Sequence, residues 1–165
     1  MRIVTGDLLN APERIIAHVV NCMGVMGGGV ALQIRKKYPE VYTEYKEFCD
    51  NKRPDGGKED NRMYTMLGVA DFVETRDHTF VYNLFAQFNY GTEKRQLDYD
   101  ALTECLNDMC QQINTYANFR DVEKKVAIPY MIGCGLAGGD WSKVCSIIET
   151  VEAENGIEFI AYKLR

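Results

Sequence analysis

The sequence has no excess of positive charge and no long apolar segment. Its 165 residues carry 19 basic and 24 acidic side chains, a formal net charge of -5. Binding to a nucleic-acid backbone requires an excess of Lys and Arg, so we expect no nucleic-acid surface. No apolar run approaches the roughly 20 residues of a membrane-spanning helix. The N-terminus resembles a strand rather than a signal peptide, and we therefore expect a cytoplasmic protein without membrane contact.

Closely spaced metal ligands are also missing. Only two histidines, His18 and His78, accompany the cysteines, so we expect neither a metal site nor another cofactor. Reduced thiols in a cytosol are the simplest interpretation. The six cysteines, none of them in a close pair, are Cys22, Cys49, Cys105, Cys110, Cys134 and Cys145.

The composition is otherwise that of an ordinary globular domain. Hydrophobic residues make up 46% of the chain and charged residues 26%. We expect one domain over residues 1–165, present as a monomer. Strands are predicted at residues 3–5, 14–20, 62–72, 79–85, 125–130 and 157–164, and helices at 29–37, 41–49, 97–119 and 142–154. This alternation predicts an α/β fold, three layers α/β/α with a central mixed sheet of about six strands.

Local signals predict the connections. Residues 51–60 are polar and rich in turn formers, which indicates a surface loop. Residues 74–78 form the turn between two strands, so His78 is expected to be exposed. The strand at 125–130 has few polar residues and is expected to lie in the middle of the sheet.

Two glycine-rich loops each connect a strand to a helix. The first spans residues 21–30 and the second residues 131–141. In α/β sheets such loops open at the carboxyl ends of their strands, where ligands bind. Glycines let backbone N–H groups approach an anion closely. Charge-assisted hydrogen bonds contribute about 1.5–3 kcal/mol each, so two facing loops could hold a diphosphate without any lysine.

Better-known phosphate motifs do not fit these loops. Val30 and Ala31 stand where a phosphate-loop NTPase has Lys and Ser or Thr, and no Gly-x-Gly-x-x-Gly follows the first strand. Cys134 lies between glycines, but a cysteine phosphatase needs Arg six residues later, and that position is Asp140. Cysteine catalysis is therefore disfavoured.

The residues resemble the macro domains, a family that binds ADP-ribose. The resemblance covers nearly the whole chain and is carried by residues 6–8, by Asn21 with residues 27–31, and by residues 132–136. It implies that Asp7 bonds the adenine amino group, that the first loop holds the distal ribose and diphosphate, and that the second closes over the diphosphate. The local sequence alone favours a turn role for Asp7, and Tyr162 either packs on adenine or is an ordinary strand tyrosine. The implied ligand-binding residues are Asp7, Leu8, Asn21, Gly27, Gly28, Gly29, Val30, Ile132, Gly133, Cys134, Gly135, Leu136, Ala137 and Tyr162.

Within this family the stretch from His18 to Pro39 is similar to the ADP-ribose 1″-phosphate phosphatases. The related deglutamylating hydrolases use a lysine where this chain has Gln87 and Phe88, and an aspartate where it has Ala137. The resemblance therefore implies a phosphatase, a phosphoric monoester hydrolase that converts ADP-ribose 1″-phosphate to ADP-ribose and phosphate. The alternatives are an ADP-ribosyl hydrolase acting on modified protein or nucleic acid, and a reader of ADP-ribose without turnover.

Three residues are candidates for the chemistry. The first is His18, either a general base or a buried strand histidine bonded to a carbonyl. The second is Asn21, which either holds the distal ribose hydroxyls or forms a turn. The third is Asp140, a general acid or base unless it caps the following helix. Gln87 and Asn89 are weaker candidates for phosphate contacts.

Overall fold

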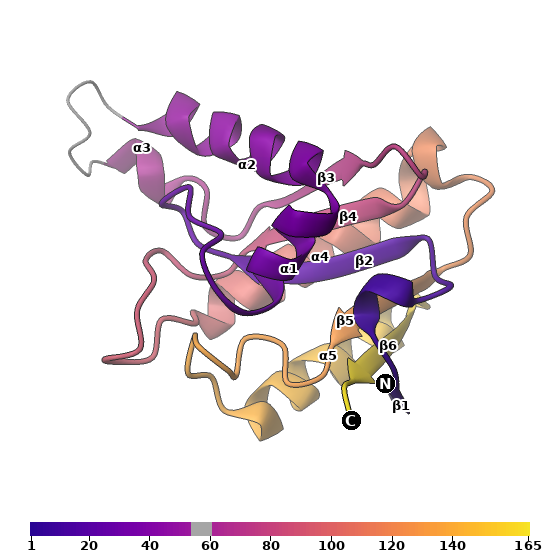
Figure 1. Ribbon diagram of the computed structural model, residues 1–165. Helices are drawn as coiled ribbons and strands as arrows, with labels where there is room; N and C mark the ends of the chain where they lie inside the picture. The colour runs from indigo at the N-terminus through magenta and orange to yellow at the C-terminus, as the bar shows by residue number, and fades with distance from the viewer. Residues whose placement is uncertain (54–60) are drawn as a thin grey trace.

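A six-stranded sheet runs through the middle of the protein, with helices on both faces, in the computed structural model shown in Figure 1. The structure describes residues 1–53 and 61–165. The strand order is β1-β6-β5-β2-β4-β3, and β3 is antiparallel to β4 while the other neighbours are parallel. The predicted mixed α/β sheet is therefore confirmed. The strands are β1 (Arg2–Thr5), β2 (Ile15–Val20), β3 (Ala70–Glu74), β4 (Phe80–Phe85), β5 (Lys125–Pro129) and β6 (Glu158–Lys163).

The helices form two layers. Helices α1, α2 and α3 cover one face of the sheet, and α4 and α5 cover the other (Figure 1). Helix α4 packs on the sheet through one apolar face. This face consists of Leu102, Leu106, Met109 and Ile113, which recur at helical spacing and are all buried. No helix in the described ranges is both long and apolar enough to span a membrane. The helices are η1 (Leu8–Asn10), α1 (Gly29–Lys37), α2 (Pro39–Lys52), α3 (Asn61–Tyr64), α4 (Tyr99–Thr115), η2 (Ala117–Phe119) and α5 (Trp141–Asn155).

The strand predicted over residues 62–72 is wrong in its first half. Residues 61–64 form α3, and strand β3 begins only at Ala70. Met63 and Met66 are both buried against the sheet at helical spacing, and Gly68 turns the chain with a φ of +89°. The loop predicted at residues 51–60 begins late, since α2 continues to Lys52. Residues 54–60 of that prediction lie outside the described residues.

The interior position predicted for β5 is confirmed. Val126, Ala127 and Ile128 are fully buried, and β5 lies between β6 and β2. Since β2 and β5 are parallel neighbours, their carboxyl ends meet at one edge of the sheet. The chain leaves β2 into the first glycine loop and leaves β5 into the second, so the two loops share that edge.

Candidate functional site

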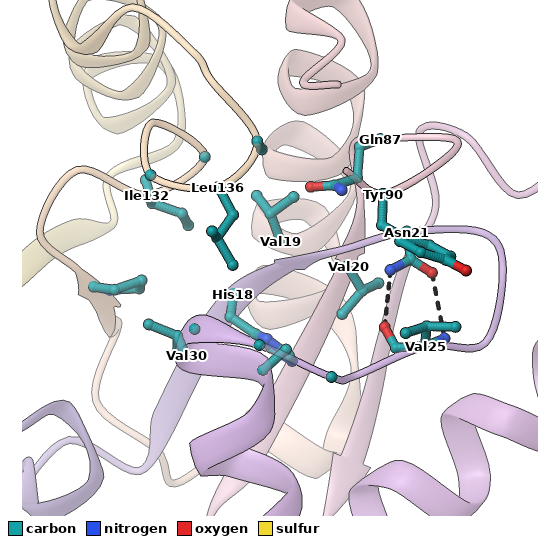
Figure 2. Close-up of a pocket in the computed structure, with 18 of the residues that line it drawn as sticks. His18, Val19, Val20, Asn21, Val25, Val30, Gln87, Tyr90, Ile132 and Leu136 are labelled. Carbon is teal, nitrogen blue, oxygen red and sulfur yellow. Dashed lines mark hydrogen bonds between the residues drawn. The ribbon is translucent and has the colours of Figure 1, made fainter. Parts of the chain in front are cut away.

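A cavity of about 770 Å³ opens at the carboxyl ends of β2 and β5 (Figure 2). Its size is that of a pocket for a drug-sized ligand or a dinucleotide. The end of β2, both glycine loops and the loop after β4 line it, through residues 18–21, 25, 27–31, 87, 90–92, 129–133 and 135–137. The structure thus brings together most of the residues that the sequence assigned to ligand binding.

The first loop presents the N-terminus of α1 to the cavity. Gly28 is the N-cap and gives no side-chain hydrogen bond to the helix, and the first turn contains no acidic residue. The N–H groups of that turn therefore remain for a ligand, together with the positive end of the helix dipole. A φ of +57° at Gly29 requires the absence of a side chain. This end of the helix is suited to an anion.

The second loop faces the first across the cavity. A Cβ atom placed on Gly28 would lie 3.1 Å from Cδ1 of Leu136, and one on Gly29 would lie 3.4 Å from the same atom. The loop is closed by an N–H donation from Gly139 to the carbonyl of Gly133 at 2.9 Å. The N–H groups of Gly135 and Leu136 have no acceptor among the described residues. Main-chain donors are thus available on both sides.

Charged side chains do not line the cavity in the described part of the chain. Its polar side chains are His18, Asn21, Gln87, Thr92 and tyrosines, beside glycines and apolar residues. Affinity for a diphosphate would therefore depend on backbone dipoles in a space partly closed to water. The protein's net charge of -5 does not act at the cavity wall itself, because no acidic residue of the ranges 1–53 and 61–165 lines it.

His18 lies on β2 beneath the first loop and is 1% exposed. Its Nε2 lies 2.7 Å from Oδ1 of Asn83 on the neighbouring strand β4. Burial lowers the pKa of His18 from 6.5 to about 4, and the hydrogen bond to Asn83 opposes that shift only in part. The imidazole is therefore neutral at pH 7. Its Nδ1 is buried and has no hydrogen-bond partner among the described residues.

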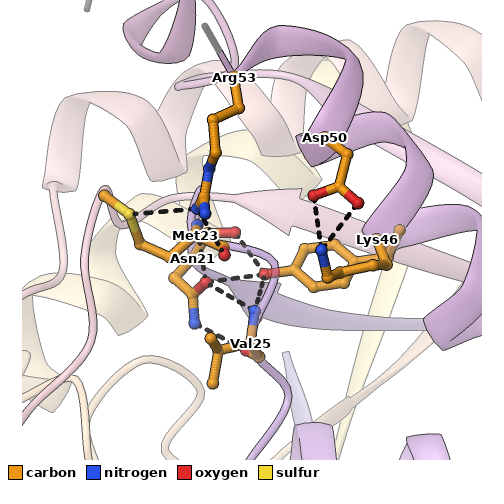
Figure 3. A network of polar contacts seen from close by, with 7 residues as sticks. Asn21, Met23, Val25, Lys46, Asp50 and Arg53 are labelled. Atoms are coloured by element: carbon orange, nitrogen blue, oxygen red, sulfur yellow. Dashed lines mark hydrogen bonds and ion pairs between the residues drawn. The ribbon is translucent and has the colours of Figure 1, made fainter. Parts of the chain in front are cut away.

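The amide of Asn21 is committed to the loop that follows it (Figure 3). Its Oδ1 accepts from the N–H of Met23 at 2.9 Å and of Val25 at 3.4 Å, and its Nδ2 donates to the carbonyl of Val25 at 2.8 Å. Figure 2 shows the side chain at the cavity wall with these bonds to Val25. Asn21 thus shapes the turn that presents the first loop. This is the turn-forming role, one of the two roles that the sequence suggested for it.

Helix α2 fixes the same loop from behind. The hydroxyl of Tyr45 lies 2.8 Å from both the carbonyl oxygen and Oδ1 of Asn21 and accepts from the N–H of Val25 at 3.1 Å. Arg53 donates to the carbonyl of Met23 at 2.9 Å. The sequence analysis missed both residues, because nothing in the local pattern links α2 to the loop.

Three residues predicted to bind the ligand, Asp7, Leu8 and Tyr162, are not among those that line the cavity. Asp7 caps η1 by accepting the N–H of Leu9 at 2.9 Å, which is the turn role. The hydroxyl of Tyr162 donates to Glu13 at 2.6 Å. Leu8 is buried in a small cluster against which both Tyr162 and the cavity residue Val30 pack. Val30 is therefore the contact between this region and the cavity.

Cys134 and Asp140 also do not line the cavity. Burial raises the pKa of Cys134 to about 11, which leaves the thiol protonated at pH 7. The carboxylate of Asp140 accepts from the N–H of Ser142 at 2.9 Å and from its hydroxyl at 3.0 Å, so the N-cap interpretation of Asp140 is confirmed. These hydrogen bonds also lower the pKa of Asp140.

The loop after β4 forms the third side of the cavity. Gln87 donates from Nε2 to the carbonyl of Asn89 at 2.8 Å, which braces the loop. Its neighbours Tyr90, Gly91 and Thr92 line the cavity, whereas Asn89 does not. Four lining residues are apolar or aromatic and at least a third exposed, and they form an apolar rim: Val25, Tyr90, Met131 and Leu136.

Comparison with known sequences identifies one family. A model described as Macro domain matches residues 17–148. A DNA ADP-ribosyl glycohydrolase of Mycobacterium tuberculosis is 44% identical over 140 residues, which are 85% of this chain and 35% of that protein. An ADP-ribose 1″-phosphate phosphatase of Scheffersomyces stipitis is 24% identical over 179 residues, covering 97% of this chain and 99% of that one.

Comparison with solved structures gives the same fold. The macrodomain of Thermus aquaticus DarG superposes with a TM-score of 0.74 at 26% identity, covering 98% of this chain and 97% of that chain. The chain spans between 35% and 41% of the length of three glycohydrolase relatives.

Proposed function

Because the chain belongs to the macro domain family, we propose that its cavity binds ADP-ribose and that the protein hydrolyses a derivative of it. The names of the two kinds of relative share the ADP-ribose group and differ in the bond that is cleaved. The observation that carries the proposal is the facing pair of glycine loops, which offers main-chain donors to a diphosphate from both sides. The specific reaction we favour is release of phosphate from ADP-ribose 1″-phosphate.

His18 supplies the group that such a hydrolysis needs. Water attacks phosphorus, the bond between phosphorus and the 1″ oxygen breaks, and that oxygen leaves with a proton. Nδ1 of His18 accepts the proton of the attacking water and returns it to the leaving oxygen. A pKa near 4 keeps the imidazole ring neutral in the empty protein, so one of its two nitrogens carries a lone pair that can accept a proton. A bound phosphate carries negative charge that raises the pKa of His18 toward the working pH.

Asn21 has a supporting part in this scheme. Its amide holds the turn from residue 21 to residue 25 and so positions the donors of the first loop. Asp140 receives no chemical step, because its carboxylate caps α5.

A second candidate is release of ADP-ribose from a modified macromolecule. The apolar rim favours it, since a nucleobase or a peptide covers apolar surface better than a bare phosphate does. Among the residues that the structure describes, no Lys or Arg lines the cavity, which also favours a neutral leaving group. Against it, Gln87 and Ala137 line the cavity where the lysine-dependent hydrolases have their reactive Lys and Asp.

Calorimetry with ADP-ribose, followed by a panel of substrates, tests the proposal. We expect micromolar binding, phosphate release from ADP-ribose 1″-phosphate, and a loss of at least about a hundredfold in that rate for His18→Ala. His78→Asn is the matched control, since His78 is exposed and distant in the turn between β3 and β4.

The results separate the candidates. Release of ADP-ribose from modified DNA or protein, without phosphate release, would favour the second candidate. Binding without any product would make the domain a reader. Failure to bind ADP-ribose at millimolar concentration would refute the whole assignment.

A further inference from the structure

Asn83 is the one side-chain amide in strand β4, whose other side chains are aliphatic or aromatic. Strand β4 has the sequence Phe-Val-Tyr-Asn-Leu-Phe, and all six residues are buried. Besides Asn83, only the tyrosine has a polar atom in its side chain. Asn83 itself is 0% exposed. A buried amide costs free energy unless its groups are hydrogen-bonded, so its presence in an interior strand calls for a partner.

That partner is His18. The two residues are paired in the register of β2 and β4, and they point to the face of the sheet that α1 covers. Nε2 of His18 and Oδ1 of Asn83 are 2.7 Å apart. A carbonyl oxygen can only accept, so Nε2 must carry the hydrogen. The other ring nitrogen, Nδ1, is then left with its lone pair.

Two buried atoms of this pair have no partner in residues 1–53 and 61–165. They are Nδ1 of His18 and Nδ2 of Asn83. Only burial and the Asn83 hydrogen bond act on the ionisation of His18, and no charged side chain contributes. Unpaired buried polar atoms are few in native proteins, and each calls for an explanation, of which a catalytic role is one.

We infer that Asn83 is a positioning residue that fixes His18, which lines the cavity, as the Nε2-protonated tautomer and so leaves Nδ1 as the proton acceptor. The kinetic part of this inference rests on the proposed function, whereas the tautomer does not. Without Asn83 the neutral ring would divide between two tautomers, and only one of them presents an acceptor on Nδ1.

The tautomer is directly measurable because the chain has only two histidines. Nitrogen-15 spectra of labelled protein at pH 7, with His78→Asn to assign the signals, report which ring nitrogen carries hydrogen. We expect His18 to show a protonated Nε2 and an unprotonated Nδ1. We expect Asn83→Leu to lose that preference. A proton on Nδ1 in the wild type, or an unchanged tautomer in Asn83→Leu, would overturn the inference.

The variant Asn83→Asp distinguishes a role of Asn83 in orienting His18 from a role in filling space. A carboxylate accepts the same hydrogen and keeps the tautomer, but its charge raises the pKa of His18 by about 1–3 units. The acidic limb of the profile of kcat/KM against pH should therefore move to higher pH, while activity is retained. A limb that stays in place would contradict the positioning role.

Gln112→Leu is the matched control for loss of a buried amide. Gln112 accepts from the hydroxyl of Tyr82 at 3.0 Å and donates to the carbonyl of Ala70 at 3.0 Å, on the opposite face of the sheet. This variant should lose stability without changing the tautomer of His18 or the rate profile. If no substrate is turned over, the proposed function fails, and the nitrogen spectra still decide the role of Asn83.

Discussion

The buried, neutral His18 predicts a specific loss of stability in acid. Its pKa is 6.5 as a model group and about 4 in the folded protein. Between pH 4 and pH 6.5, His18 of the unfolded chain binds a proton and His18 of the folded protein does not. Protonation therefore favours unfolding, and the stability falls as the pH drops from about 6.5 to about 4. Above pH 6.5 the effect vanishes, since His18 is neutral in both states.

The size of the effect follows from the same two values. One pKa unit corresponds to about 1.4 kcal/mol, so full protonation of the unfolded chain removes at most about 3 kcal/mol. Native domains are stable by only about 5–15 kcal/mol, which makes such a loss a large fraction of the total. This loss of unfolding free energy should be measurable in the absence of substrate.

Urea unfolding at a series of pH values between 7 and 4 measures this loss. The single tryptophan, Trp141 at the start of α5, provides the fluorescence signal. His18→Gln removes the titrating ring, so its stability should fall less than that of the wild type over this range. Asp71, whose pKa burial raises to about 6, acts in the opposite direction and cancels in the comparison.

The exposed His78 serves as the control, because His78→Asn should keep the pH dependence of the wild type. Equal slopes for the wild type and His18→Gln between pH 6.5 and 4 would refute the reasoning. His18 would then not be held neutral by burial, and its assignment as a proton acceptor would lose its basis.

Four further predictions concern the loops and the residues that hold them. Gly139→Ala should cost about 1–3 kcal/mol in urea unfolding, because its Cβ would lie 2.7 Å from the carbonyl oxygen of Gly133. Gly135→Ala should leave stability nearly unchanged, since no atom lies within 4 Å of its added Cβ. Asp140→Ala should lower the unfolding free energy by about 1 kcal/mol through loss of the α5 cap; an unchanged midpoint would contradict the cap. Tyr45→Phe should weaken ADP-ribose binding in calorimetry while circular dichroism stays as in the wild type, because the first loop loses the hydroxyl that orders it; unchanged affinity would show that the loop holds its shape without it.

The glycine loops were predictable from sequence because their signals are local. A strand, a run of glycines and a helix start occur within a few residues of one another, and the topology of α/β sheets places both loops at one edge. The strand at residues 62–72 was mispredicted for the converse reason. Met63 in the short helix α3 and Met66 in the turn after it are both buried, and these tertiary contacts outweigh the weak intrinsic preference of so short a segment.

The residues that hold the site in place were not predictable as such. Tyr45 reaches the first loop from α2 across a separation of 20 residues, and Asn83 reaches His18 across 65. The hydrophobic pattern of β2 and β4 indicates which face each residue occupies, but it does not show that these two strands are neighbours, and only their pairing brings Asn83 opposite His18. The sequence does contain one signal for Asn83, an amide inside an apolar strand. That signal shows that a partner is needed without showing which one.

A negatively charged protein can favour an anion here because the donors are fixed before the ligand arrives. The N–H groups of the α1 terminus and of Gly135 and Leu136 are set by the backbone, so no side chain must be ordered on binding. In a partly closed cavity these dipoles interact more strongly than they would in water. The acidic side chains act through solvent, where salt screens them within about 8 Å at physiological ionic strength. The selectivity of the site therefore depends on where the glycines let the backbone approach, and a methyl group on Gly28 would alter it more directly than a change of surface charge would.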